Sequence, residues 1–167
     1  MKNIVLIGMM GCGKTTVGRI LAHDLARRQI DTDSYIEAQT GRTIPDLFAA
    51  EGEDYFRRLE TAAAEELAAQ SGLILSCGGG LPTVDASIAP LYQSGTVFWL
   101  DRDPEDTIDR LDVSGRPLAQ QGKADFLARY AVRAPIYRRW AHHIIRGSSP
   151  RDAAEQIKAI LQKEERA

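Results

Sequence analysis

Residues 8–15 read Gly-Met-Met-Gly-Cys-Gly-Lys-Thr and follow directly on the apolar run at 4–7. Glycines let successive backbone N–H groups turn inward, and a helix beginning at about Lys14 adds the positive end of its dipole. Lysine and threonine at the end of such a loop can neutralise β- and γ-phosphate oxygens and place a hydroxyl on Mg²⁺. We therefore predict a nucleotide phosphate site in the loop residues Gly11, Cys12, Gly13, Lys14, Thr15 and Thr16. A glycine-rich turn with an incidental lysine is the competing interpretation.

Asp31 and Asp33 form a second group of chemically capable residues. In an extended backbone, alternate side chains lie on one side, so both carboxylates can face one cleft. If this segment ends the second strand of the sheet, the pair lies beside the phosphate loop. Asp31 would then reach Mg²⁺ through water, and Asp33 would accept a hydroxyl proton from the phosphoryl acceptor. The alternative is an acidic turn that caps the next helix. Asp101, which ends the apolar run at 95–100, is a second candidate for the metal-side acid.

Arg57 and Glu60 are three residues apart in a segment, 53–70, with helical spacing of apolar residues. Glu60 could hold the guanidinium in one orientation for a planar anion such as a carboxylate. An ordinary surface ion pair is the competing interpretation. Three glycines at 78–80 follow the buried run at 73–77, at an edge where backbone can approach a ligand.

The apolar runs at 3–7, 73–77 and 95–100 alternate with segments of helical periodicity, which is typical of an α/β fold around a parallel sheet. A shorter extended piece ends at Asp31, and a last strand is expected after His142. Ser149 and Pro150 are predicted to begin the final helix. The polar stretch 112–124 interrupts the pattern, and we interpret it as a flap.

Length and composition narrow the functional classes. A chain of 167 residues fits a single domain, 1–167. With 21 basic and 23 acidic residues, it has no basic footprint for nucleic acid or for an anionic membrane, and neither is expected as a partner. The two lone cysteines favour a reducing, cytoplasmic compartment. We expect neither a signal segment nor a membrane span.

Several segments, in a fixed order, resemble shikimate kinase: DTDSYIE at 31–37, GRTIPDLF at 41–48, YFRRLE at 55–60, CGGG at 77–80, GRPL at 115–118 and RAPIYRR at 133–139. The resemblance covers nearly the whole chain. It implies ATP-dependent phosphorylation of the 3-hydroxyl of shikimate, a step of aromatic amino-acid biosynthesis. It also implies a three-layer α/β/α fold of the P-loop NTPase type, with a five-stranded parallel sheet, a substrate-binding region at about 32–60 and a lid at about 112–124.

The resemblance assigns roles residue by residue. Asp33 matches the acid that holds the substrate hydroxyls, and the positions that hold the carboxylate and ring are matched by Arg57, Gly79, Gly80 and Arg133. Arg116 matches the lid arginine that closes on the transferring phosphoryl group. Lys14, Thr15 and Asp31 match the ATP and magnesium positions. Within this set we expect Asp33, Lys14 and Arg116 to be catalytic, shikimate to be the partner, and the chain to act as a monomer.

Two other functions share part of this pattern. A related small-molecule kinase that acts on gluconate or a nucleoside monophosphate would share the loop, the fold and the lid. The combination of Asp33, Arg57 and Arg133 with the triple glycine separates shikimate from these acceptors. A nucleotide-dependent switch would need a guanine-reading Asn-Lys-x-Asp segment, which the sequence lacks.

Overall fold

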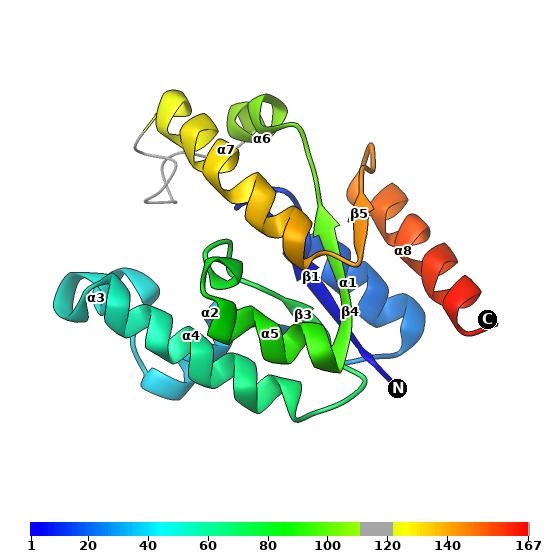
Figure 1. The fold of residues 1–167 in the computed structure, drawn as a ribbon, viewed down its shortest axis with the longest axis horizontal. Helices are drawn as coiled ribbons and strands as arrows, with labels where there is room; N and C mark the ends of the chain where they lie inside the picture. Colours follow the sequence, from blue (N-terminus) through cyan, green and yellow to red (C-terminus); the bar gives the residue numbers. More distant parts are fainter. Residues whose placement is uncertain (111–121, 167) are drawn as a thin grey trace.

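The computed structural model describes residues 1–110 and 122–166 and shows an α/β fold around a parallel sheet (Figure 1). In the described residues the sheet has five strands in the order β2-β3-β1-β4-β5, and every pairing is parallel. The strands are β1 (Asn3–Ile7), β2 (Gln29–Asp31), β3 (Ile74–Ser76), β4 (Gly95–Leu100) and β5 (His143–Ile145). The fold class expected from the sequence is therefore confirmed.

Helices cover both faces of the sheet, because side chains of a strand alternate between its two faces. On one face, Ile4 and Leu6 of β1 pack with α1 (Lys14–Leu25) and α8 (Pro150–Glu164). On the other face, Val5 and Ile7 share a core with residues of α4 (Glu53–Ala68), α5 (Asp85–Ser94) and α7 (Lys123–Trp140). Both faces are closed by apolar side chains, so the polar carboxyl edge of the sheet is left for ligands.

Residues 32–60, expected to form the substrate-binding region, contain α2 (Thr32–Thr40), α3 (Ile44–Glu51) and the first turns of α4. They have a small core of their own, made by Ile36, Leu47, Phe56 and Ala63. Two further elements complete the described chain: a single 3₁₀ turn, η1 (Leu81–Thr83), after the triple glycine, and α6 (Pro104–Arg110) after β4. No helix in the described parts of the chain is long and apolar enough to cross a membrane.

Local signals in the sequence place several element ends correctly. The final helix begins as predicted, with the Ser149 hydroxyl accepting a hydrogen bond of 3.1 Å from the Asp152 N–H. The expectation of an extended backbone through Asp33 is wrong, because β2 ends at Asp31 and α2 begins at Thr32. Of the expected lid at 112–124, residues 112–121 lie outside the described residues, and Lys123 already belongs to α7.

Candidate active site

The predicted phosphate loop joins the carboxyl end of β1 to the first turn of α1. Its three glycines have positive φ angles, +146° at Gly8, +76° at Gly11 and +99° at Gly13, a region that other residues rarely adopt. A Cβ at Gly8 would also lie 2.9 Å from the Cys12 Sγ and from the Leu100 carbonyl oxygen. Gly13 caps α1 without a side-chain hydrogen bond, so the N–H groups of that first turn are available to an anion.

Lys14 folds back over this loop. Its ammonium Nζ donates hydrogen bonds of 2.8 Å to the carbonyl oxygens of Gly8 and of Met9, and the Cys12 Sγ lies 3.7 Å away. The charge is thus held at the place where nucleotide phosphates would lie, as the loop spacing predicts.

Asp31 serves two purposes at the end of β2. Its Oδ2 accepts a hydrogen bond of 3.1 Å from the Thr15 hydroxyl, which joins the end of the phosphate loop to β2. Its Oδ1 accepts hydrogen bonds from the N–H groups of Asp33 (3.0 Å) and Ser34 (3.1 Å), and so caps α2. The cap considered from the sequence is therefore present, together with the contact to Thr15 that a metal-side acid requires.

Asp33 lies in the first turn of α2, not on the strand, yet its carboxylate still reaches the central cleft. A Cβ at Gly78 would lie 2.7 Å from Asp33 Oδ1, so the carboxylate packs directly on the glycine backbone. The Gly78 N–H donates a hydrogen bond of 2.9 Å to the Thr32 hydroxyl, which fixes α2 against this backbone. Asp33 Oδ1 is buried and has no hydrogen-bond partner among the residues that the structure describes. Burial, and next the neighbouring Asp31 charge, raises the pKa of Asp33 to about 6.

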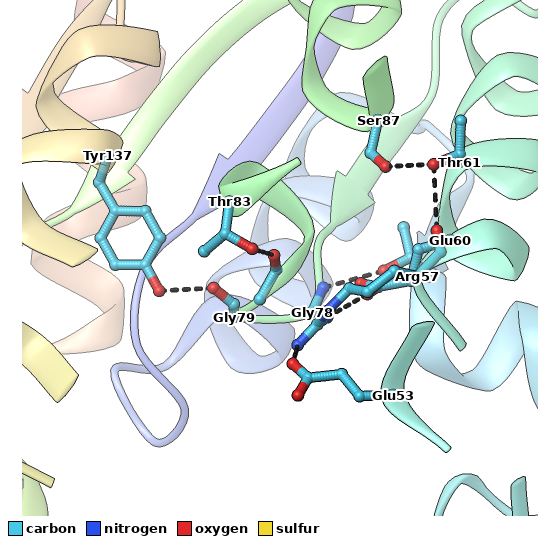
Figure 2. Close-up of polar contacts among 11 residues, drawn as sticks. Glu53, Arg57, Glu60, Thr61, Gly78, Gly79, Thr83, Ser87 and Tyr137 are labelled. Atoms are coloured by element: carbon cyan, nitrogen blue, oxygen red, sulfur yellow. Dashed lines mark hydrogen bonds and ion pairs between the residues drawn. The ribbon is translucent and has the colours of Figure 1, made fainter. Parts of the chain in front are cut away.

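Arg57 is held between two carboxylates of its own helix, α4. Its guanidinium donates to Glu60 and, over 3.1 Å, to Glu53 (Figure 2). The Glu60 side chain is only 1% exposed, and burial raises its pKa to about 7 although the adjacent Arg57 charge opposes the shift. The interpretation of a surface ion pair is wrong, because Glu60 is buried. A Cβ at Gly80 would collide with the Arg57 guanidinium.

Arg133 approaches the triple glycine from the other side, on α7. Its Nη1 would lie 3.3 Å from a Cβ at Gly79, and burial lowers the pKa of the guanidinium. Four residues later, the Tyr137 hydroxyl donates a hydrogen bond of 2.6 Å to the Gly79 carbonyl oxygen (Figure 2). Sequence reasoning missed Tyr137, although its place one helical turn after Arg133 within RAPIYRR could have indicated it.

The triple glycine is therefore the point at which Asp33, Arg57 and Arg133 meet, each packed against one glycine. It also touches the phosphate loop, because a Cβ at Gly79 would lie 3.4 Å from the Gly8 carbonyl oxygen and 3.6 Å from the Met10 nitrogen. One carboxylate and two guanidinium groups thus surround a position next to the predicted phosphate site.

Of the remaining residues singled out in the sequence, one is not described by the structure and one does not join this cluster. Arg116 lies outside the described residues. Asp101 uses Oδ1 to accept a hydrogen bond of 2.7 Å from the Tyr130 hydroxyl and Oδ2 to accept one of 3.0 Å from Arg146. Its contacts therefore differ from those of a metal-side acid, and Asp31 keeps that assignment.

Cys77, His142 and His143 lie outside the acceptor cluster and make structural contacts. Cys77 is buried, and burial raises the pKa of its thiol. The His142 Nδ1 accepts a hydrogen bond of 2.9 Å from the Val97 N–H, whereas the His143 Nε2 lies 2.8 Å from a Glu164 oxygen. Within the described ranges, no group of three His, Cys, Asp or Glu side chains is placed to hold a metal ion.

Known proteins with similar sequences and folds agree on one family. A protein named shikimate kinase from Clostridium botulinum (strain Eklund 17B / Type B) is 40% identical over 163 residues, which cover 96% of this chain and 98% of that protein. Another from Symbiobacterium thermophilum is 44% identical over 147 residues, covering 84% and 83%. A solved structure of shikimate kinase from Acinetobacter baumannii in complex with shikimate has a TM-score of 0.92 and 38% identity, and the match covers 98% of this chain and 94% of that one.

The family model described as shikimate kinase matches residues 10–164, which include the phosphate loop from Met10 on, the triple glycine and the segment around Arg133. Sequence, fold and the arrangement of charged side chains thus lead to one conclusion. The chain belongs to the shikimate kinase family and is a kinase.

Proposed function

We propose that this kinase transfers the γ-phosphoryl group of ATP to the 3-hydroxyl of shikimate, with Asp33 as the base. The observation that carries the proposal is the convergence of Asp33, Arg57 and Arg133 on the triple glycine beside the phosphate loop. Shikimate has a carboxylate at one end and hydroxyls at the other, and this cluster offers two cations and one acid. The relative from Acinetobacter baumannii was solved in complex with shikimate, which supports the same acceptor here.

The two arginines suit the acceptor's carboxylate. Guanidinium groups bind a planar carboxylate through paired N–H donors, which a lysine cannot reproduce. Glu60 holds Arg57 on the inner side, and its burial makes that contact hard to exchange for water. Arg133 lies on a different helix from Arg57, so the two guanidinium groups would bind the shikimate carboxylate from two directions. This would hold the shikimate ring in one orientation.

Asp33 would act on the hydroxyl end. As the hydroxyl oxygen attacks the γ-phosphorus, its proton passes to the Asp33 carboxylate, the bond to the bridging oxygen of ATP breaks, and ADP leaves. The raised pKa of Asp33, about 6, still leaves it mainly ionised at pH 7 and makes it a better proton acceptor than an exposed aspartate. Its unpartnered Oδ1 is the atom available for that hydrogen bond.

The phosphate loop would hold the nucleotide. The N–H groups of the first turn of α1 face the phosphates, and Lys14 would leave the Gly8 and Met9 carbonyls to neutralise the transferred group. The Thr15 hydroxyl and the Asp31 carboxylate fit a magnesium ion in chemistry, because both offer oxygen atoms, and they already lie 3.1 Å apart. Bound Mg²⁺ would neutralise charge on the β- and γ-phosphates.

The proposed role of Arg116 rests on the sequence alone. We propose that it closes on the phosphoryl group during transfer and helps to keep water away, since water would otherwise accept the phosphoryl group.

The test is shikimate-dependent release of ADP from Mg-ATP, with gluconate and nucleoside monophosphates assayed in parallel. We expect turnover with shikimate alone, and NMR of the product should show phosphate on the 3-hydroxyl. Turnover with another acceptor would leave a kinase but reassign Arg57 and Arg133. If no acceptor supports ADP release above the Asp33→Asn background, the proposed function is wrong.

A further inference from the structure

Asp101 does not belong to the cluster of Asp33, Arg57 and Arg133, called here the acceptor cluster. Its carboxylate is nevertheless held by several contacts. It follows the last residue of β4 at the carboxyl edge of the sheet, and its side chain is only 10% exposed. Tyr130 donates to one carboxylate oxygen over 2.7 Å, and both Nε and Nη2 of Arg146 lie 3.0 Å from the other. A carboxylate with both oxygens occupied in this way is a fixed anchor point.

Tyr130 links Asp101 to α7, the helix that contains Arg133. Residues 130, 133 and 137 have the i, i+3 and i+7 spacing that places side chains on one face of a helix. Tyr130 is bonded to Asp101 after β4, and Tyr137 is bonded to the Gly79 carbonyl after β3. Arg133 is therefore bracketed by two tyrosine hydroxyls, each tied to the carboxyl edge of the sheet.

Two such ties fix the rotation of α7 about its axis. The other contacts of the helix with the core are apolar and therefore less directional: Phe126 and Tyr137 are buried, and Tyr130, Ala134 and Trp140 pack partly buried against the same core. Without the Tyr130 hydrogen bond, the apolar contacts and the Tyr137 hydrogen bond would still hold the helix, but one of its two hydroxyl contacts with the carboxyl edge of the sheet would be lost. The long Arg133 side chain would then be positioned less closely. In Figure 1, α7 runs across the carboxyl side of the sheet, so its rotation changes where Arg133 points.

Arg146 orients Asp101 from the opposite side. It lies between β5 and α8, next to Gly147, Ser149 and Pro150, which line a small cavity together with Asp101 and with Cys12 of the phosphate loop. Because Arg146 pairs with Oδ2, Oδ1 is left facing Tyr130. The carboxylate thus lies between Arg146 and α7, the helix that contains Arg133.

We propose that Asp101 is a positioning residue for the acceptor: through Tyr130 it sets the rotation of α7 and so aims Arg133 at the shikimate carboxylate. The inference rests on the proposed function, because it requires Arg133 to bind that carboxylate. Neither Asp101 nor Tyr130 touches the substrate in this assignment. Their effect is confined to the acceptor side, since the phosphate loop is built by β1 and α1.

The first test removes one oxygen atom. Tyr130→Phe keeps the ring and deletes the hydrogen bond to Asp101, and we expect the KM for shikimate to rise about fivefold, as for a lost hydrogen bond to a charged group. The KM for ATP should stay within about twofold of the original, a split that general loosening of the fold would not produce. Tyr92→Phe is the matched control, because the Tyr92 hydroxyl has no hydrogen-bond partner among the described residues and its ring stacks on His142.

The second test asks whether the effect passes through Arg133. In an Arg133→Ala background, Tyr130→Phe should leave kcat/KM for shikimate unchanged, because there is no guanidinium left to aim. An equal loss in both backgrounds would overturn the proposal, and so would a Tyr130→Phe variant that behaves like Tyr92→Phe or loses ATP and shikimate affinity alike. The unaltered enzyme is assayed first: if it does not phosphorylate shikimate, the proposed function fails before any variant is compared, and the inference falls with it.

Discussion

The Thr15 hydroxyl and the Asp31 carboxylate are joined by a hydrogen bond of 3.1 Å that connects the phosphate loop to β2. Both partners are only half-buried, so the contact is accessible to solvent. Both atoms are oxygens of the kind that magnesium prefers, directly or through water.

Thr15→Val should therefore act on the metal rather than on the fold. The change keeps the shape of the side chain and deletes the hydroxyl, and we expect the Mg²⁺ concentration for half-maximal activity to rise about tenfold or more. A titration of activity against Mg²⁺ at fixed ATP measures it, with the free energy of unfolding as the control for folding. An unchanged Mg²⁺ dependence would remove Thr15 from the metal site.

Asp33→Asn tests the base. Because the amide keeps the shape but cannot accept the proton, kcat should fall by roughly two orders of magnitude or more while ATP still binds. In the unaltered enzyme the pKa of Asp33 is raised to about 6, so kcat/KM for shikimate should fall as the pH drops below about 6 and the carboxylate takes up a proton. Rates across pH 5 to 8 measure this. A flat profile, or full turnover by the variant, would contradict the assignment.

The raised pKa of Asp33 also leads to a prediction about the free energy of unfolding. The folded-state pKa of Asp33 lies above the ordinary aspartate value of 3.8, so the folded protein binds this proton more tightly than the unfolded chain does. That contribution to stability is fully present below about pH 4 and is lost as the pH rises through about 6. Asn carries no charge to bury, so Asp33→Asn should be more stable than the unaltered enzyme at pH 8 by about 3 kcal/mol and nearly equal to it at pH 4. Urea unfolding at the two pH values compares them, and a variant that is less stable at pH 8 would contradict the burial argument.

Gly80→Ala should weaken the acceptor site without unfolding the chain. Gly80 has φ −87°, which alanine adopts freely, but an added methyl group would occupy the place of the Arg57 guanidinium. We expect the KM for shikimate to rise about tenfold or more, with a smaller effect on the KM for ATP. Gly79→Ala is the comparison, because its methyl group would meet Arg133 at the milder distance of 3.3 Å. Equal effects of the two substitutions would mean that contact with Arg57 does not decide the outcome.

Much of the candidate site could be predicted from local patterns in the sequence. The phosphate loop could be predicted because its glycines, lysine and threonine act within eight consecutive residues, and Arg57 and Glu60 could be paired because three residues of helix make them neighbours. Asp33 was predicted to face the cleft for the wrong local reason: its place comes from the start of α2 and not from strand alternation. A capping carboxylate at Asp31 ends the strand there, and spacing alone could not decide between the two geometries.

Contacts between segments that are far apart in the sequence could not be predicted from such local patterns. Asp101 matched a metal-side acid by its position after an apolar strand, but its partners Tyr130 and Arg146 are 29 and 45 residues away in the chain. Tyr137 and Gly79 are separated by 58 residues. The two tyrosine pairs depend on how α7 lies over the sheet, and the Arg146 pair depends on the pairing of β5 with β4. No single segment of the sequence encodes these arrangements.

The position of Lys14 has a consequence for which anions can settle in the loop. Its ammonium already has two partners, the Gly8 and Met9 carbonyls, so the loop supplies its own weak counter-ligand. The ammonium has three N–H donors, so an anion that takes more than one of them must compete with these carbonyls, and we expect a polyphosphate with several strongly charged oxygens to compete better than chloride. We therefore expect the loop to select among anions by their charge density, independently of any contact with the nucleoside.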